Sequence, residues 1–255
     1  KGINIEAIID NREEIDSKLI KETEKNNIKI YKGHTVVDTS GYRRISNISI
    51  MQLSKDGQKV VGIRKKIDCD CLGISGGWTP AVHLFTQSGG KLKFRDEDQV
   101  FIPNKYPSDQ ISIGACNGDF TLNEILSSVP IVLKEFLGIK KTDYENIEVQ
   151  SSYNKSKRNI WLLPSDKVIG KTKPFVDFQN DATAKDIKLA LREGFRSIEH
   201  VKRYTTTGMG TDQGKLGNMH ALGIISETAG SKMGELGTTT FRPPYTPLTF
   251  GTIVG

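Results

Sequence analysis

The first 31 residues alternate between strand-like and helix-like patterns, and this order restricts the fold more than any other stretch of the chain. Residues 3–10 are apolar and β-branched, residues 12–26 form a charged segment with an apolar edge, and residues 28–31 return to a strand pattern. Strand, helix and strand in this order predict part of a β-α-β unit, and therefore an α/β fold.

A β-meander is predicted directly after this unit. Residues 43–53 and 59–68 are strand-like and flank the turn Ser54–Gly57, which is typical of a hairpin. Two further short apolar runs, residues 71–75 and 111–115, also read as strands. The sequence thus predicts an α/β domain with an inserted meander.

A long helix is predicted from Thr121, because Glu124 stands three residues later in capping-box spacing before an apolar stripe. Pro130 should bend or break this helix. The stretch 139–173 is rich in Asn, Ser and Lys and contains the apolar island 160–163. We interpret it as a linker with one edge strand.

Two shorter helices are predicted near the C-terminal end. Thr183 and Asp186 have capping-box spacing, Gly194 weakens the end of that first helix, and Ser197 caps a second one. These two helices predict a small packing unit. Residues 247–255 have a strand-like pattern.

The composition limits the class of protein. The 255 residues suffice for one or two domains with real cores. No apolar run is long enough to cross a bilayer and no secretion signal is present, so we expect a cytoplasmic protein. The net charge of +6 comes from scattered lysines. This favours an anionic dinucleotide or an acidic partner protein over nucleic acid.

The three cysteines, Cys69, Cys71 and Cys116, are too few and too dispersed for a disulfide framework or a metal site. We expect them to be reduced core residues. The loop Gly208–Lys215 has glycines and a lysine, but its spacing does not match a phosphate-binding loop. We therefore do not expect a nucleoside triphosphatase. His83 is interpreted as a packed or exposed histidine without a catalytic role.

Asp10 ends the first predicted strand, where a dinucleotide-binding fold has an acidic residue. Its carboxylate can accept hydrogen bonds from both ribose hydroxyls of the adenosine, which favours NAD over NADP. A helix-cap role is the alternative, and Arg12 leaves NADP binding open. The glycine-rich pyrophosphate turn belongs about 20 residues upstream. Since the sequence starts at Lys1, we expect a fragment.

Two glycine-containing turns are candidates for the rest of the dinucleotide. The run 73–80 resembles a turn of the two-dinucleotide-binding flavoprotein reductases, and its glycines Gly76 and Gly77 let a backbone approach a cofactor closely. A tight strand-to-helix turn explains them equally well. The run 114–119 resembles the terminal motif of the same reductases, which places a helix amino terminus near a flavin or dinucleotide.

The string GWTPAVHLFTQSGGKL at residues 77–92 closely resembles the alpha subunits of heterotetrameric sarcosine oxidases. Residues 175–218 resemble a bacterioferritin-associated-ferredoxin-like module, in which cysteine pairs hold an iron–sulfur cluster. An iron–sulfur cluster needs thiolates, and the matching side chains provide none. We therefore expect no cluster here. The matching positions are Asp177, Gln179, Asp212 and Gly217.

This resemblance implies four parts. Residues 1–138 are expected to form a partial FAD/NAD(P)-binding Rossmann-like domain with the inserted β-meander, and residues 139–174 a linker with an edge strand. Residues 175–225 are expected to form a small helical cysteine-free ferredoxin-like module. Residues 226–255, which include the string GTTTFRPPYTPLTFG, resemble the junction that leads to a folate-binding half in these subunits.

The resemblance also implies a reaction. The complete enzyme is expected to demethylate sarcosine oxidatively to glycine, forming hydrogen peroxide and formaldehyde or methylenetetrahydrofolate. It implies NAD in this chain, FAD and FMN with the partner beta subunit, tetrahydrofolate in the downstream part, and beta, gamma and delta subunits in a heterotetramer.

No catalytic residue is expected in this chain, because the chemistry belongs to cofactors and other subunits. The expected binding residues around the adenosine are Asp10, Asn11, Arg12 and Val36. Those expected along the remaining dinucleotide are Gly76, Gly77, Ala115, Phe120 and Leu122. Two other classes stay open: part of an opine or cyanide-forming amine dehydrogenase that uses a cluster, and a non-catalytic assembly subunit.

Overall fold

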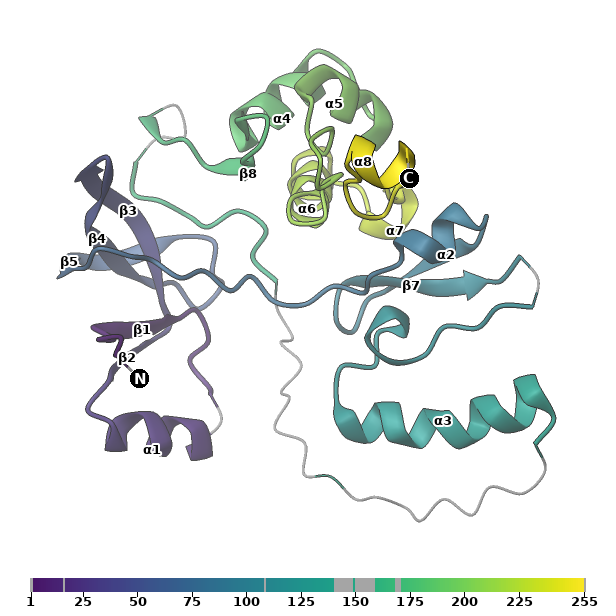
Figure 1. The fold of residues 1–255 in the computed structure, drawn as a ribbon. Helices are drawn as coiled ribbons and strands as arrows, with labels where there is room; N and C mark the ends of the chain where they lie inside the picture. Colours follow the sequence, from purple (N-terminus) through teal and green to yellow (C-terminus); the bar gives the residue numbers. More distant parts are fainter. Residues whose placement is uncertain are drawn as a thin grey trace. The chain divides into compact units, whose positions relative to one another are not determined.

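The computed structural model describes residues 2–15, 17–107, 109–139, 149, 159–167 and 171–254 (Figure 1). The chain divides into two compact units. The first unit comprises residues 1–76 and 162–173, and the second comprises residues 77–161 and 174–255.

The first unit begins with the predicted β-α-β order. Strand β1 (Ala7–Asp10), helix α1 (Ser17–Lys25) and strand β2 (Lys29–Lys32) follow one another, and β1 pairs in parallel with β2. The register sets Asp10 opposite Lys32. Parallel strands end at the same edge of a sheet, so Asp10 and the residues that follow β2 lie near one another at this edge.

The predicted meander is confirmed and has one more strand than expected. Strands β3 (His34–Tyr42), β4 (Arg44–Leu53) and β5 (Val60–Asp68) form an antiparallel sheet in the order β3-β4-β5. Ile48 and Ile50 are buried, and a register shift after Ile50 buries Met51 and Leu53 as well. This irregularity allows β4 to change which alternate residues point inward.

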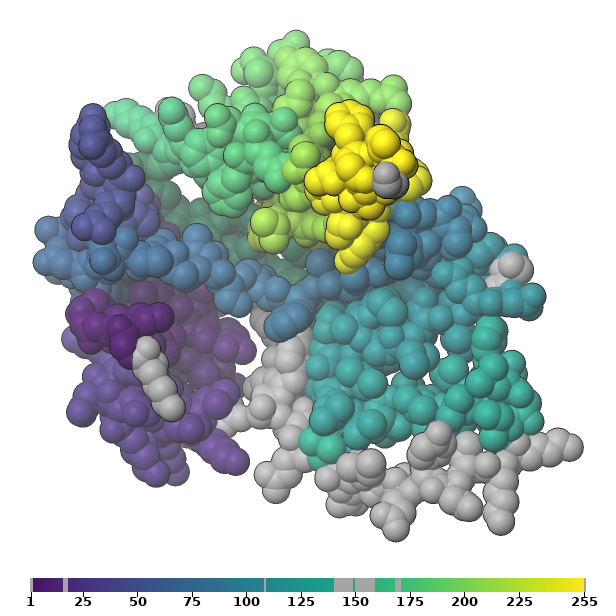
Figure 2. Space-filling model, viewed as in Figure 1, coloured from purple at the N-terminus to yellow at the C-terminus, as the bar shows by residue number. Residues whose placement is uncertain are grey.

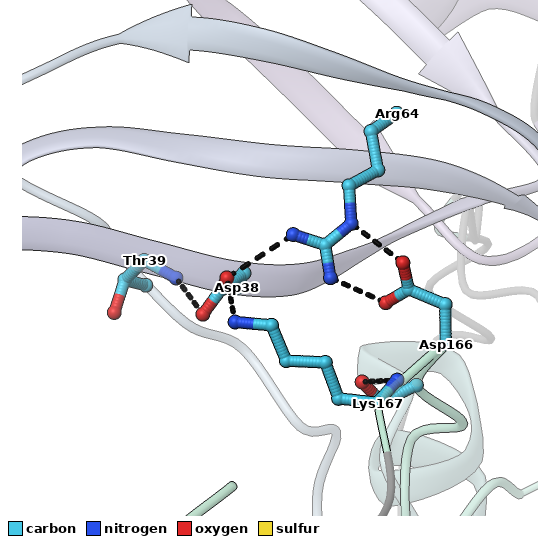
Figure 3. Close-up of polar contacts among 6 residues, drawn as sticks. Asp38, Thr39, Arg64, Asp166 and Lys167 are labelled. Carbon is cyan, nitrogen blue, oxygen red and sulfur yellow. Dashed lines mark hydrogen bonds and ion pairs between the residues drawn. The ribbon is translucent and has the colours of Figure 1, made fainter. Parts of the chain in front are cut away.

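A short segment distant in sequence is attached to the meander by ion pairs (Figure 3). The Arg64 side chain on β5 donates to both carboxylate oxygens of Asp166, from Nε at 2.6 Å and Nη2 at 2.5 Å, and to Asp38 on β3 at 3.1 Å. The Lys167 ammonium also donates to Asp38. Hydrogen bonds from Arg64 hold the pKa of Asp166 below its usual range.

Three predicted strands are wrong. Residues 71–75 and residues 160–163 are not in a strand. Residues 111–115 run into the 3₁₀ helix η1 (Gly114–Asn117), because Gly114 has a left-handed φ of +72° that ends the extended backbone. A short apolar run forms a strand only where another strand offers it hydrogen bonds.

The second unit builds its first layer around a hairpin. Strands β6 (Lys91–Arg95) and β7 (Val100–Lys105) pair in an antiparallel manner, and helix α2 (His83–Gln87) precedes them. The first residues of β7, Val100, Phe101 and Ile102, are buried; β7 contacts η1, and its partner strand β6 contacts α2 and α7 (Met233–Leu236).

Helix α3 (Leu122–Leu137) begins at the predicted cap. The Thr121 hydroxyl accepts the Glu124 N–H, and the Glu124 carboxylate accepts the Thr121 N–H, both at 3.1 Å. Pro130 does not break the helix, which continues for seven more residues. A proline removes one backbone hydrogen bond, and the turns on either side of Pro130 keep theirs.

The remaining helices form the second layer. Strands β8 (Phe175–Asp177) and β9 (Ala182–Thr183) lead into the two predicted helices, α4 (Ala184–Arg192) and α5 (Ile198–Thr205). A third helix, α6 (Asn218–Ala229), packs on α4. The largest fully buried side chains of these helices are Ile187, Val201, Leu222, Ile224 and Ile225.

The strand-like pattern of residues 247–255 gives a helix at residues 250–254, so that prediction is wrong. Helix α8 (Phe250–Val254) begins after Thr249, whose hydroxyl accepts the Thr252 N–H at 3.4 Å. Threonine is a common residue at this cap position. The helix lies on the surface, in yellow in Figure 2.

None of the helices in the described residues is long and apolar enough to cross a membrane. The three cysteines are free thiols, as predicted, but Cys71 is exposed and only Cys69 and Cys116 are half-buried. The expectation that all three belong to the core is therefore wrong.

Candidate cofactor-binding site

Asp10 lies at the carboxyl end of β1 and is bonded to Arg12. Its Oδ1 accepts the backbone N–H of Arg12 at 2.9 Å and the Nε–H at 3.0 Å, and its Oδ2 accepts Nη2 at 2.7 Å. Burial acts to raise the pKa of Asp10, but the hydrogen bonds and charge of Arg12 outweigh it and lower the pKa. The carboxylate is therefore ionised at neutral pH and already holds a cation.

The loop after Asp10 crosses the end of β2. The Gly33 N–H donates to the Arg12 carbonyl at 3.0 Å, and Gly33 has a left-handed φ of +59°. A Cβ atom at Gly33 would lie 3.0 Å from the Glu13 side chain, so a glycine lets the two segments approach closely. This contact positions Asp10, Asn11 and Arg12 at the edge where both parallel strands end.

Val36 belongs to the neighbouring strand β3, which contacts β1. It is half-buried, opposite Ile50 in the sheet, whereas Asn11 is exposed. The four residues predicted for the adenosine therefore come from one unit, with three of them on a single loop.

The five remaining predicted residues begin at the boundary between the two units. Gly76 is the last residue of the first unit and Gly77 the first of the second, and both are exposed. Gly77 has a φ of +103°, and a Cβ atom there would meet no atom within 4 Å. The backbone at Gly77 is thus open to an approaching molecule.

Ala115 lies in η1, Phe120 in the loop that follows it, and Leu122 at the first position of α3. Ala115 and Leu122 are exposed and Phe120 is half-buried. Arg95 holds this loop, because its Nη2 donates to the Gly118 carbonyl at 2.7 Å and to Asp98 at 2.5 Å. The structure gathers these three residues in one place within the second unit.

The four positions that match cysteines in the ferredoxin-like module lie on two segments that contact each other: the end of β8 with the turn after it, and the loop before α6. Asp177 is buried, and its carboxylate accepts the N–H groups of Gln179 at 2.8 Å, Asn180 at 3.0 Å and Gly208 at 2.7 Å. The Gln179 side chain accepts from Thr211 at 3.2 Å and from the Asp212 N–H at 3.4 Å.

The segment around Asp177 and the loop before α6 also contact each other through the backbone. A Cβ atom at Gly217 would lie 2.4 Å from the Val176 carbonyl. Burial acts to raise the pKa of Asp177, but its hydrogen bonds from Gly208, Asn180 and Gln179 outweigh it and lower the pKa. An ionised carboxylate with four donors therefore joins the two segments. Within the described residues there is no group of three or more His, Cys, Asp or Glu side chains suited to a metal ion.

His83, which we interpreted from the sequence as a packed or exposed histidine, is buried beside a cavity. His83 is 8 % exposed, and neither ring nitrogen has a hydrogen-bond partner in the described part of the chain. Its ring centroid lies 3.8 Å from that of Phe241 and 5.5 Å from that of Tyr245. Burial, and to a lesser extent the charge of Lys215, lower the pKa of His83 to about 4.

The cavity has a volume of about 40 Å³ and belongs entirely to the second unit. No local pattern in the sequence indicates it, because its walls come from segments far apart in the chain: α2 and the residues before it, β7, α5, the loop before α6, α6 itself and the segment after α7. Its lining includes Val82, His83, Lys215, Asn218, Leu222 and Phe241.

The chain is similar to several known proteins. Residues 171–255 match the sarcosine oxidase A3 domain. The chain is 36 % identical to the sarcosine oxidase alpha subunit of Rhizobium meliloti (strain 1021), over 86 % of this chain and 23 % of that protein. It is 32 % identical to the sarcosine oxidase alpha subunit of Corynebacterium sp. (strain P-1), over 98 % of this chain and 26 % of that protein.

The chain thus spans about a quarter of the length of these relatives. A shorter similarity, 33 % identity over 29 % of this chain and 16 % of the relative, is to the A subunit of opine oxidase from Rhizobium meliloti (strain 1021). The fold is similar to that of L-proline dehydrogenase from P. horikoshii, with a TM-score of 0.59 and 17 % identity, over 96 % of this chain and 49 % of that one.

Proposed function

We propose that this chain, which is homologous to sarcosine oxidase alpha subunits along nearly its whole length, is the NAD-binding and scaffold part of an oxidoreductase that acts on the CH–NH group of sarcosine. The observation that carries this proposal is the similarity to two alpha subunits over 86 % and 98 % of the chain. The match of residues 171–255 to the A3 domain also supports the relationship to sarcosine oxidase.

The geometry at the end of β1 suits an adenosine ribose. Asp10 is ionised and can accept hydrogen bonds from two hydroxyl groups once Arg12 releases it. Arg12 is then available for a phosphate, while Asn11 and Val36 flank the adenosine. Binding of NAD here therefore exchanges one partner of Asp10 for another.

The rest of the dinucleotide is assigned to residues with accessible backbone. Gly76 and Gly77 carry no Cβ, and Ala115, Phe120 and Leu122 precede or begin α3. Backbone N–H groups at a helix amino terminus favour an anion such as a pyrophosphate or a flavin phosphate. A dinucleotide supplies the carrier chemistry, and these residues only bind and orient it.

In the proposed enzyme, the FAD and FMN flavins lie with a beta subunit, and tetrahydrofolate binds in a part of the protein downstream of this chain. Gamma and delta subunits complete a heterotetramer in the cytoplasm. Sarcosine yields glycine and hydrogen peroxide, with the methyl carbon leaving as formaldehyde or methylenetetrahydrofolate. The helical module acts as a scaffold without an iron–sulfur cluster, because hydrogen bonds of Asp177 and Gln179 join the segments that cysteines would otherwise link.

The NAD assignment is tested by replacing Asp10→Ala in the complete protein and measuring NAD affinity by equilibrium dialysis. Hydrogen bonds to a charged acceptor contribute about 1.5–3 kcal/mol, so the affinity should fall by roughly 10- to 150-fold. Asp68→Ala is the matched control, because it removes an exposed carboxylate from β5 of the same unit. Equal NAD affinity in the wild type and both variants would refute the Asp10 site.

An opine or cyanide-forming amine dehydrogenase is the second candidate, favoured by the similarity to an opine oxidase. Enzymes of that class that carry a cluster contain iron and acid-labile sulfide. The complete protein is expected to contain neither in stoichiometric amount and to consume oxygen with sarcosine but not with an opine. Stoichiometric iron and sulfide, with turnover of an opine, would reverse this choice.

A further inference from the structure

The His83 side chain is buried without a hydrogen-bond partner among the described residues. Both ring nitrogens are buried and unpartnered within the described residues, and the ring contacts the rings of Phe241 and Tyr245. Buried polar groups in folded proteins nearly always have a partner, whether protein, water or ligand. Phe241 and Tyr245 contact His83 through their rings, and His83 also lines the adjoining cavity, which offers room for a partner.

The cavity limits the size of that partner. Its 40 Å³ can hold about three or four waters, at roughly 10–15 Å³ each. A molecule of about four or five non-hydrogen atoms therefore fits, whereas a nucleotide or a flavin ring does not. Val82, Leu222 and Phe241 make much of the wall apolar, which suits a short hydrocarbon part.

The charge around the cavity selects an anion. Lys215 lines it, lies 4.1 Å above the Tyr245 ring and donates to the Tyr245 carbonyl. The charge of this ammonium contributes to the low pKa of His83, so at neutral pH the imidazole is uncharged and carries one N–H donor. No Asp or Glu lines the cavity among the described residues.

We propose that the cavity beside His83 binds a small organic monocarboxylate of two or three carbons. The carboxylate accepts from the imidazole N–H and the Lys215 ammonium, and its methyl or ethyl group lies against Val82, Leu222 and Phe241. Zwitterionic amino acids are disfavoured, because their ammonium would meet Lys215 as a like charge. This site is independent of the proposed NAD site, since it uses other residues and another ligand.

The experiment measures binding of radiolabelled acetate to the complete protein at pH 7 by equilibrium dialysis. His83→Phe keeps an aromatic ring without nitrogens, and Lys215→Met keeps the length of the side chain without its charge. Each should weaken binding at this site at least tenfold. His200→Phe on α5 and Lys93→Met on β6 alter exposed residues of the same unit and should leave it within twofold of the wild type.

A structure of the complete protein with acetate gives the second readout and does not depend on any variant folding. Acetate between His83 and Lys215 supports the proposal. Water alone beside His83, or acetate binding that both variants retain, overturns it. Propylammonium, a cation of similar size, should not bind in the cavity, and its binding there would refute the anionic assignment.

Discussion

Replacing His83→Phe is expected to remove a pH dependence that the wild-type second unit shows between pH 7 and pH 5. Folded His83 has a pKa of about 4, whereas an unfolded histidine titrates near 6.5. The unfolded form therefore binds more protons in this window, so the free energy of unfolding falls as the pH falls from 6.5 towards 4. Above pH 6.5 the contribution of His83 to the free energy of unfolding is fully present.

The magnitude follows from the two pKa values. From pH 6.5 down to pH 4 and below, the free energy of unfolding falls by roughly 3 kcal/mol, at about 1.4 kcal/mol for each tenfold difference in proton affinity. Between pH 7 and pH 5 it amounts to about 2 kcal/mol, because folded His83 stays mostly neutral at pH 5 while the unfolded form is mostly charged. Local opening of α2 should become easier by about 30-fold.

Hydrogen exchange of a peptide covering residues 82–90 measures this opening in the complete protein, with protection factors that divide out the intrinsic pH dependence of exchange. Acetate-free buffers keep the cavity beside His83 free of the proposed ligand. His83→Phe should flatten the pH dependence, and His200→Phe should leave it as in the wild type. If all three proteins lose protection equally between pH 7 and pH 5, His83 is not buried as a neutral ring and the reasoning is wrong.

Three further predictions concern packing and loop contacts, each read by hydrogen exchange in the complete protein. Asp177→Asn replaces one acceptor oxygen by a donor, so opening of the loop 206–217 should become easier by about 2 kcal/mol, and unchanged exchange there would contradict the role of Asp177. Gly223→Ala places a Cβ about 2.1 Å from the Trp161 ring, so it should lower the free energy of unfolding by roughly 1–3 kcal/mol and speed exchange of residues 159–163. Unchanged protection of these residues would show that Trp161 does not pack there. Arg64→Ala should speed exchange of residues 162–167, as 1 M salt should in the wild type, while Lys66→Ala serves as the control.

The sequence predicted the elements whose signals lie within a few residues of one another. The β-α-β order at the start and the turn Ser54–Gly57 were confirmed, as were the helix starts at Thr121 and Thr183. A capping box or a hairpin turn stabilises one local structure whatever the rest of the chain does.

The failures are short apolar runs. Residues 71–75 and 111–115 have strand-like composition but no strand beside them, whereas residues 91–95 and 100–105 pair with each other. In residues 91–95 charged and apolar side chains alternate, and this signal for a strand was present in the sequence. Residues 250–254 form a helix because Thr249 caps them.

The contacts at the candidate sites also divide into those between near neighbours, which the sequence indicates, and those between distant residues, which it does not. Asp10 and Arg12 are two residues apart, so their proximity at a strand end follows from the sequence. The contact of Asp177 with Gly208 spans 31 residues, and that of Arg64 with Asp166 spans 102. No local pattern contains such pairs.

By itself, the sequence determined the order of the first strands and helices, the acidic residue that ends β1, and the lack of thiolates at the positions that match cluster ligands. Only the tertiary structure decided that His83 is buried without a partner among the described residues and that Lys215 and Phe241 line a cavity beside it. Hydrogen bonds in turns and caps form between near neighbours, whereas burial and the pKa changes that it causes depend on which distant segments pack around a side chain.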